Sequence, residues 1–161
     1  MRSEEEANRA IERYADTVRR ICMVHLKNDS DTEDIFQTVF LKYVLWPKSF
    51  ESEEHEKAWI IRVTINACKD LLKNFFRSRT IPLDSLKEQA HIPEDEHREL
   101  WDAVLSLPEK YRNVVYLYYY EEYSAAEISV ILNKNVNTVY TLLTRARQLL
   151  KKELEGGTGN A

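Results

Sequence analysis

Apolar residues recur every three or four positions along most of the chain, which is the spacing of one face of an α-helix. The first apolar stripe runs over residues 7–25, the second over residues 35–44 and the third over residues 59–75. Pro47 ends the second predicted helix, because proline lacks a backbone N–H and disfavours helical geometry in the residue before it. These three stretches predict a small N-terminal helical domain.

The periodic pattern lapses between residues 80 and 97, where two prolines interrupt the chain. A stretch with prolines and without a sustained period is typical of a linker. Helical spacing resumes at residue 98 and continues to about residue 155, and the short glycine-containing tail 156–161 predicts disorder. We therefore expect an all-α protein with helical domains at 1–79 and 98–155, joined by a flexible acidic linker at 80–97.

Motifs with a serine three residues before a glutamate, as in a capping box, are predicted to begin three of the helices. They are Ser30 to Glu33, Ser106 to Glu109 and Ser124 to Glu127. The last box opens a short helix that ends at Asn133, a residue type that tolerates the left-handed conformation of a helix C-terminus. The short helix, a break at 134–136 and a longer helix at 137–152 have the proportions of a helix-turn-helix.

The second helix of this motif has a polar outer face. Its apolar stripe leaves amide, hydroxyl and guanidinium groups on the opposite side, at Asn137, Tyr140, Thr141, Thr144, Arg145 and Gln148. Such groups can contact base edges and phosphates in a major groove. An ordinary amphipathic hairpin in a helical bundle shares the apolar pattern, so the polar chemistry is what indicates DNA.

The charge of the chain is strongly divided along the sequence. The 161 residues have a net charge of −4, which taken alone argues against nucleic acid. Residues 62–79 have a net charge of +4 and residues 134–152 one of +5, whereas residues 81–105 have one of −5. Screening limits phosphate attraction to about 10 Å, so two basic helices can bind DNA on an acidic chain. Each could equally be a solvated surface, which is the commonest use of lysine and arginine.

Other functional classes are disfavoured by the sequence. The longest apolar run, Val114 to Tyr120, is far shorter than the ~20 residues that span a bilayer, and the acidic N-terminus is unlike a secretory signal. We expect a cytoplasmic protein that is not membrane-inserted. The segments from Glu88 to His91 and from Glu94 to His97 have the Glu-x-x-His spacing of di-iron bundles, but Pro93 separates them within one short stretch. We therefore expect no metal, no cofactor, no small-molecule substrate and no catalysis.

The C-terminal half contains a further set of motifs, namely Leu107-Pro108, Arg112, the helix with Ser124, Glu127 and Ile128, Asn137-Thr138-Val139, and Arg145-Ala146-Arg147. This set resembles the promoter-reading fourth region of bacterial sigma factors. Residues 31–43 independently resemble the core-polymerase-binding helix of the second region, and residues 58–79 resemble the helix that recognises and opens the minus-ten element. Two regions joined by a short linker are typical of the extracytoplasmic-function (ECF) group.

The resemblance implies a transcription initiation factor that binds core RNA polymerase, directs it to promoters and helps to melt promoter DNA. It implies docking on the clamp coiled coil of the largest catalytic polymerase subunit through Asp34, Ile35, Gln37, Thr38 and Leu41. Phe36 and Phe40 are expected equally in the core or in that contact. Members of the group are commonly held inactive by an anti-sigma factor, so the resemblance also implies such a partner and a role in stress response.

For promoter DNA the resemblance implies two sets of contacts. The minus-ten set is Arg62, Asn66, Lys69, Lys73 and Arg77, with Ser49 and Phe50 capturing an extruded base. The minus-thirty-five set is Asn137, Thr138, Tyr140, Thr141, Thr144, Arg145 and Arg147. Trp59 lies on the apolar stripe and is expected in the core, and Asp70 is interpreted as structural.

The sequence departs from the family pattern at several positions. The loop before the third helix is unusually acidic, Glu122 and Asn133 replace customary glycines, and Lys134 occupies a normally apolar position. Tyr140 and Leu142 stand where a basic residue is more usual, which leaves open which side chains read bases. The alternative function is a stand-alone helix-turn-helix regulator that does not dock on polymerase, but it leaves the 31–43 helix unexplained.

Overall fold

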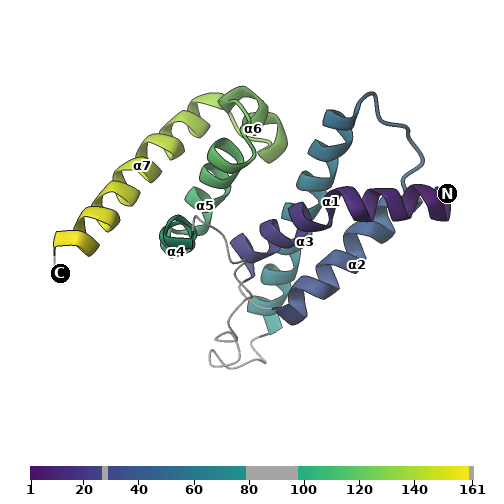
Figure 1. Ribbon diagram of the computed structural model, residues 1–161, viewed down its shortest axis with the longest axis horizontal. Coiled ribbons are helices and arrows are strands. Elements are labelled where there is room, and N and C mark those ends of the chain that lie inside the picture. Colours follow the sequence, from purple (N-terminus) through teal and green to yellow (C-terminus); the bar gives the residue numbers. More distant parts are fainter. Residues whose placement is uncertain (27–28, 79–97, 160–161) are drawn as a thin grey trace. The chain divides into compact units, whose positions relative to one another are not determined.

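The computed structural model describes residues 1–26, 29–78 and 98–159, with side chains for residues 1–26, 29–73 and 102–153. The chain divides into two compact units, Met1–His91 and Ile92–Ala161 (Figure 1). The predicted linker at 80–97 lies outside the described residues. All regular elements of the described residues are helices, which confirms the all-α prediction.

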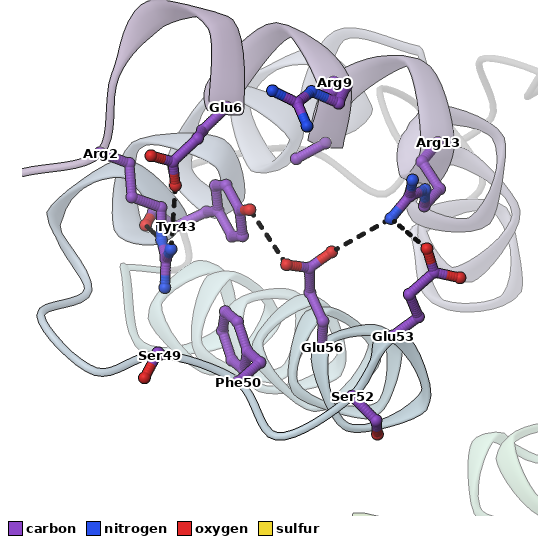
Figure 2. A pocket seen from close by; sticks show the side chains of 11 residues that line it. Arg2, Glu6, Arg9, Arg13, Tyr43, Ser49, Phe50, Ser52, Glu53 and Glu56 are labelled. Atoms are coloured by element: carbon purple, nitrogen blue, oxygen red, sulfur yellow. Dashed lines mark hydrogen bonds and ion pairs between the residues drawn. The ribbon is translucent and has the colours of Figure 1, made fainter.

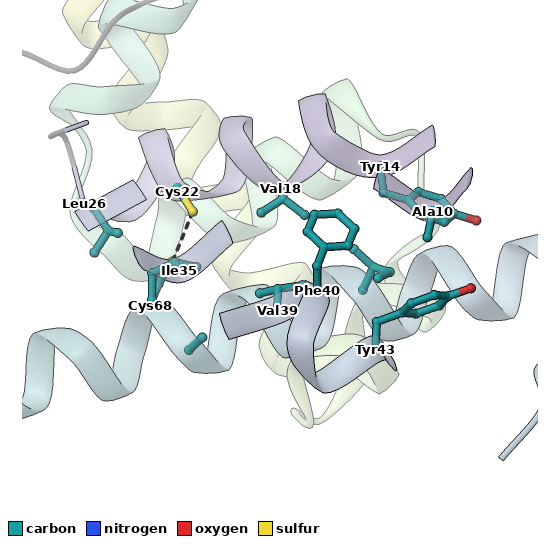
Figure 3. Packing of buried hydrophobic residues seen from close by; sticks show 12 residues of the cluster. Ala10, Tyr14, Val18, Cys22, Leu26, Ile35, Val39, Phe40, Tyr43 and Cys68 are labelled. Carbon is teal, nitrogen blue, oxygen red and sulfur yellow. Dashed lines mark hydrogen bonds between the residues drawn. The ribbon is translucent and has the colours of Figure 1, made fainter. Parts of the chain in front are cut away.

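The first unit contains α1 (Glu4–His25), α2 (Asp29–Leu45) and α3 (Glu53–Ser78), and each of these helices packs against the other two. Their apolar stripes meet in one core, whose packing is drawn in Figure 3. The buried members of this core are Ala10, Tyr14, Val18, Cys22, Leu26, Ile35, Val39, Phe40, Tyr43, Ile60, Ala67 and Cys68. The two cysteines are fully buried free thiols from α1 and α3, with their sulfur atoms 4.0 Å apart.

The ends of the first-unit helices follow local chemistry. Ser3 caps α1 by accepting a hydrogen bond from the Glu6 amide at 3.1 Å. The second helix begins at Asp29, so Ser30 lies inside it and is not the cap that the sequence predicts. It ends at Leu45, before Pro47, as the restricted geometry of a residue preceding proline requires.

The second unit contains α4 (Arg98–Ser106), α5 (Glu109–Val115), the π-helix η2 (Tyr116–Tyr120), α6 (Ala125–Leu132) and α7 (Val136–Gly159). Helix α7 contacts α4, α5 and α6, and it continues to Gly159, past the predicted helix end. Among its described side chains, the buried ones are Val139, Leu142, Leu143 and Ala146, whereas Leu149 is 38% exposed.

Of the two capping boxes predicted in the second unit, one forms. Ser124 accepts from the Glu127 amide at 3.1 Å, and the Glu127 carboxylate accepts from the Ser124 amide at 2.9 Å. The Ser106 box is wrong, because the Ser106 hydroxyl donates back to the Ala103 carbonyl at 2.6 Å and α5 begins only after Pro108. Pro108 is the N-cap of α5 and makes no side-chain hydrogen bond there; its ring restricts the backbone φ angle at the start of the helix.

Among the residues that the structure describes, two non-glycine residues have positive φ, Glu122 at 61° and Asn133 at 53°. Both stand where the family pattern has glycine. Asparagine tolerates the left-handed region through local hydrogen bonding, whereas for glutamate this conformation costs about 1–2 kcal/mol. The conformation of Glu122 in the turn between η2 and α6 therefore lowers the stability of the second unit.

Replacing Glu122 with glycine should relieve this cost. We expect Glu122→Gly to raise the free energy of unfolding of the second unit by up to about 1 kcal/mol, since part of the relief is offset by the greater freedom of glycine in the unfolded chain. Urea denaturation followed by far-ultraviolet circular dichroism measures the change. Asn133→Gly is the matched control, and we expect it to raise the free energy of unfolding by less. A lower free energy of unfolding in Glu122→Gly would show that the conformation of Glu122 is not strained.

Candidate nucleic-acid interface

One face of α3 is polar and basic. Arg62, Asn66, Lys69 and Lys73 are all exposed, and their spacing of three and four residues puts them on a single stripe of the helix. Arg77 continues the same spacing on α3, but its side chain lies outside the described ones. Asp70, interpreted from the sequence as structural, is also exposed beside the stripe. The opposite face of α3 is buried, with Ile60, Ile61 and Cys68 fully enclosed.

This basic stripe leads into a pocket of about 690 Å³. Apolar and aromatic side chains form much of its lining, and cationic or polar groups complete it: Lys42, Leu45, Trp46, Lys48, Ser49, Phe50, His55, Trp59, Arg62 and Val63. Trp59 lies 5.3 Å from the Trp46 ring and 5.5 Å from the Phe50 ring, measured between centroids. Trp59 thus packs against the core, as the sequence predicts, and also lines the pocket.

The loop between α2 and α3 supplies Ser49 and Phe50 to the pocket. Ser52 caps α3 by accepting from the His55 amide at 3.1 Å, and the His55 ring nitrogen accepts from the Glu51 amide at 3.2 Å. The Phe50 ring lies edge-on to the His55 ring, with centroids 5.5 Å apart. The loop therefore has a specific conformation, and Phe50 is its apolar anchor.

A single carboxylate connects α3 to both other helices of the unit. Glu56 accepts hydrogen bonds from the Tyr14 hydroxyl at 2.9 Å and from the Tyr43 hydroxyl at 3.1 Å. Arg13 lies 3.9 Å from the same carboxylate and pairs with Glu53 at 3.1 Å. Figure 2 shows Glu56 between Tyr43 and Arg13. Glu53 and Glu56, which the sequence resemblance places in an unusually acidic loop, thus lie in the first turn of α3 and have structural partners.

Both tyrosines are held in their neutral, hydrogen-donating form. Burial, followed by the hydrogen bond to Glu56, raises the pKa of Tyr14 above its ordinary value. Burial and the charge of Glu56 raise the pKa of Tyr43. Because the folded-state pKa values are raised, the contribution of these phenols to stability is complete at neutral pH and declines as the pH rises above about 10.

The exposed face of α2 lies beside the pocket. Asp34, Gln37, Thr38 and Leu41 are exposed at helical spacing, and Leu41 retains 60% of its accessible surface. Ile35 is 4% exposed in the core, so its predicted polymerase contact is wrong; its position on α2 faces α1 and α3. Of the two phenylalanines left undecided, Phe40 is a core residue, and Phe36 is half-buried with the Arg19 guanidinium 4.7 Å from its ring.

Leu45 extends this α2 face by one further turn. It retains 59% of its accessible surface and also lines the pocket, so an exposed leucine joins the two surfaces. Its spacing of four residues from Leu41 is a sequence signal that places it on the same helix face.

In the second unit, α6 and α7 form the predicted helix-turn-helix. Asn133 makes the left-handed turn, and the Asn135 side chain accepts from the Asn137 amide at 2.8 Å at the start of α7. The predicted reading face is exposed at every position: Asn137, Thr138, Tyr140, Thr141, Thr144, Arg145 and Arg147. Lys134, Lys151 and Lys152 are exposed too, so the +5 charge of residues 134–152 is on the surface.

Arg147 has protein partners in addition to solvent. Its Nε donates to the Tyr119 hydroxyl, and its guanidinium carbon lies 5.4 Å from the Tyr118 ring centroid. The hydrogen bond to Tyr119 raises the pKa of Arg147. These tyrosines belong to the π-helix η2, which helical periodicity alone does not reveal. Arg147 is therefore held in a defined orientation at one edge of the reading face.

Within the side chains that the structure describes, no group of three His, Cys, Asp or Glu residues could hold a metal ion. The two Glu-x-x-His segments between residues 88 and 97 lie outside the described residues. Of the described helices, none is long and apolar enough to cross a membrane.

Family sequence models match both units of the chain. The model described as "Sigma-70 region 2" matches residues 10–79, and that described as "Sigma-70, region 4" matches residues 97–150, together covering well over half of the chain. The chain belongs to the sigma-70 family. The first unit therefore contains region 2, and the second contains region 4 with its helix-turn-helix.

Curated relatives match the chain along most of their length. The chain is 28% identical over 158 residues to the ECF RNA polymerase sigma factor SigW of Bacillus subtilis, covering 88% of this chain and 84% of that protein. It is 29% identical over 147 residues to the ECF sigma factor SigM of the same organism, covering 86% and 88%. These relatives agree with the ECF group that the sequence resemblance indicates.

Solved structures share the fold. The sigma factor RpoE of Bartonella quintana, solved with the anti-sigma factor NepR, matches with a TM-score of 0.74 and 17% identity, covering 94% of this chain and 98% of that chain. CnrH, solved with the cytosolic domain of CnrY, matches with a TM-score of 0.68 and 19% identity, covering 96% and 90%. At these identities the likeness establishes the fold.

The Glu56 contacts give a direct stability prediction for region 2. Glu56→Gln keeps the side-chain size but removes the charge and one of the two acceptor oxygens. Hydrogen bonds to charged groups contribute about 1.5–3 kcal/mol each, so we expect a loss of about 1–3 kcal/mol in the free energy of unfolding, measured by denaturant titration.

Glu54→Gln is the matched control for this change. Glu54 is an exposed glutamate in the same first turn of α3, so it has the same relation to the helix dipole. Its replacement should change the stability by less than about 0.5 kcal/mol. Equal effects of the two substitutions would show that the tyrosine contacts contribute nothing specific.

Proposed function

We propose that this protein is a transcription initiation factor that brings core RNA polymerase to specific promoters and helps to melt the DNA. The observation that supports it best is the continuity of the exposed basic stripe of α3 with the aromatic pocket at Phe50 and Trp59. Phosphates are attracted by lysine and arginine, and Asn66 offers an amide that can pair with a base edge. A stripe for a DNA strand thus ends at a pocket for one base.

The pocket has the chemistry needed to hold an extruded base. Taking a base out of the stack costs a few kcal/mol, which a pocket must offset by stacking and by hydrogen bonds to the base edge. Phe50, Trp46 and Trp59 supply aromatic surface, and stacking on such rings contributes about 1–3 kcal/mol per base. Ser49 and Lys48 supply polar groups at the same opening. Trapping one unstacked base would nucleate melting.

The helix-turn-helix of region 4 supplies the second DNA contact. We propose that Asn137, Tyr140, Thr141 and Thr144 approach base edges, and that Arg145 and Arg147 anchor phosphates, with Arg147 oriented by Tyr119. Two linked modules raise each other's effective concentration, so each promoter contact can be weak by itself.

Docking on polymerase is assigned to the exposed face of α2. Asp34, Gln37 and Thr38 offer polar groups, and Leu41 offers an apolar side chain with 60% of its surface free to be buried by a partner. This face gives the 31–43 helix a role, which a stand-alone helix-turn-helix regulator does not. The regulator alternative is therefore not favoured.

The remaining expectations follow from the same assignment. The protein would act where core polymerase is, in the cytoplasm, and it would catalyse no bond chemistry itself. We also propose an anti-sigma partner, because the solved structure of RpoE, which has the same fold, holds such a factor. A partner covering both DNA-binding regions would prevent promoter binding.

The polymerase assignment predicts a selective loss of affinity. Replacing Asp34 and Gln37 with alanine, or Leu41 with alanine, should weaken binding to core polymerase about tenfold or more, as for central interface residues. Bio-layer interferometry with purified core enzyme measures the affinity. Glu33→Ala on the same helix is the control, since Glu33 is exposed away from this face and makes only a 4.0 Å surface ion pair with Arg19. Full affinity in the α2-face variants would refute the assignment.

The DNA assignment predicts two different losses on α3. Lys69→Ala should weaken promoter binding by the holoenzyme for all sequences and reduce the slope of log affinity against log salt by about one. Asn66→Ala should leave the salt slope unchanged and weaken binding in a sequence-dependent manner, if its amide contacts a base. Salt titrations on a mapped promoter and on a scrambled fragment distinguish these results. Identical behaviour of the two variants would contradict the assigned roles.

A further inference from the structure

Arg2 connects the N-terminal segment to the end of α2 and to the loop that follows. Its backbone N–H donates to the Val44 carbonyl at 3.0 Å, and its Nε donates to the Tyr43 carbonyl at 3.1 Å. Its Nη2 donates to the Lys48 carbonyl at 2.6 Å, inside the loop that contains Phe50. One side chain thus joins a helix end to the loop.

The guanidinium also contacts the aromatic rings of Tyr43 and Phe50. Its central carbon lies 4.7 Å from the Tyr43 ring centroid and 5.0 Å from the Phe50 ring centroid. The two rings are nearly parallel, at 4°, with centroids 6.1 Å apart. The separation of the rings is too wide for direct face-to-face contact, and the guanidinium bridges them at one side, as Figure 2 shows for these labelled residues.

The physical chemistry of these contacts favours a fixed loop. The last carbonyls of a helix have no partner within the helix, and a cation near them is favoured by the helix dipole. Arg2 satisfies two such carbonyls of α2, while its planar fork reaches the Lys48 carbonyl at the same time. Its side chain is only 14% exposed, and Glu6 balances its charge at 3.3 Å. An aromatic ring beside a partly desolvated guanidinium adds cation–π attraction.

Phe50 would have fewer constraints without this residue. The ring is partly buried, and its other ring contacts are to Tyr43, His55 and Trp59. Between Trp46 and Ser52, the hydrogen bond from Arg2 to Lys48 holds the backbone in the first half of the loop, and the His55 bond to Glu51 holds it in the second.

We propose that Arg2 is a positioning residue for base capture, which holds the Lys48–Phe50 segment so that the aromatic pocket is formed before DNA arrives. Arg2 is not among the residues assigned to DNA contact. It would act on an extruded base only through Phe50. The proposal rests on the proposed function, because it assigns the pocket to an extruded base. A preformed pocket avoids the ordering cost that a flexible loop would bring to DNA binding.

The test compares Arg2→Ala and Arg2→Lys with Arg9→Ala in otherwise complete protein. Arg9 is an exposed arginine of α1 beside the same loop, so its removal is a control for charge. The readouts are the affinity for core polymerase, and the rate of open-complex formation measured by permanganate reactivity of unpaired thymines on a mapped promoter.

We expect Arg2→Ala to slow open-complex formation about tenfold while polymerase affinity changes less than about twofold. Arg2→Lys should restore only part of the rate, because an ammonium cannot bond the Tyr43 and Lys48 carbonyls as a planar fork does. Arg9→Ala should behave as wild type. Hydrogen exchange of the free protein should show faster exchange at the Glu51 amide in Arg2→Ala, with the core of α1, α2 and α3 unchanged.

The alternatives give different results. A normal rate in Arg2→Ala, with melting abolished in Phe50→Ala, would overturn the role of Arg2 and leave the proposed function standing. Faster exchange throughout the three helices would overturn it too, since Arg2 would then be a general stability residue. Wild-type holoenzyme that melts no promoter would instead contradict the proposed function itself.

Discussion

The carboxylate of Glu56 is the polar interaction on which the arrangement of region 2 depends. It stands in the first turn of α3 and accepts from a tyrosine of α1 and a tyrosine of α2, while Arg13 lies close by. An apolar core brings the three helices together, but apolar contact is not directional. The two hydrogen bonds fix the N-terminal end of α3 relative to Tyr43, and through the Tyr43 ring they fix Phe50 and Trp59. The shape of the pocket, and the position of the basic stripe that leads to it, depend on this placement of α3.

The distribution of charge explains how an acidic chain can have two basic helices, the ones proposed to contact DNA. Residues 81–105 have a net charge of −5, whereas the exposed faces of α3 and α7 are basic. Two acids in the first turn of α3 also have partners within region 2, because Glu53 and Glu56 contact Arg13 and the tyrosines. Their negative charge is thereby partly balanced within region 2, which reduces the repulsion they would exert on a DNA strand at the pocket.

Periodicity predicted which stretches are helical and most of the core, because amphipathic helices of this length express their buried face directly in sequence. It was less informative about contacts between segments distant in sequence. The family resemblance assigns Ile35 to the polymerase contact, although this residue lies on the apolar stripe of α2 and is buried in the core. Ser106 matched a capping box, but its hydroxyl bonds to Ala103, and Pro108 sets the start of α5. The π-helix, the Arg147 contact with Tyr119 and the Arg2 contacts depend on tertiary packing, which no local pattern encodes.

Transcription in vitro with purified core polymerase is the decisive test of whether this protein directs the polymerase to specific promoters. Supercoiled genomic fragments would be transcribed with core enzyme alone and with core enzyme plus this protein, and the start sites mapped. If the protein has this role, new and discrete start sites should appear that share two short upstream sequence elements, one for each region proposed to bind DNA. Start sites indistinguishable from those of core enzyme alone, with a folded protein that binds the polymerase, would contradict it.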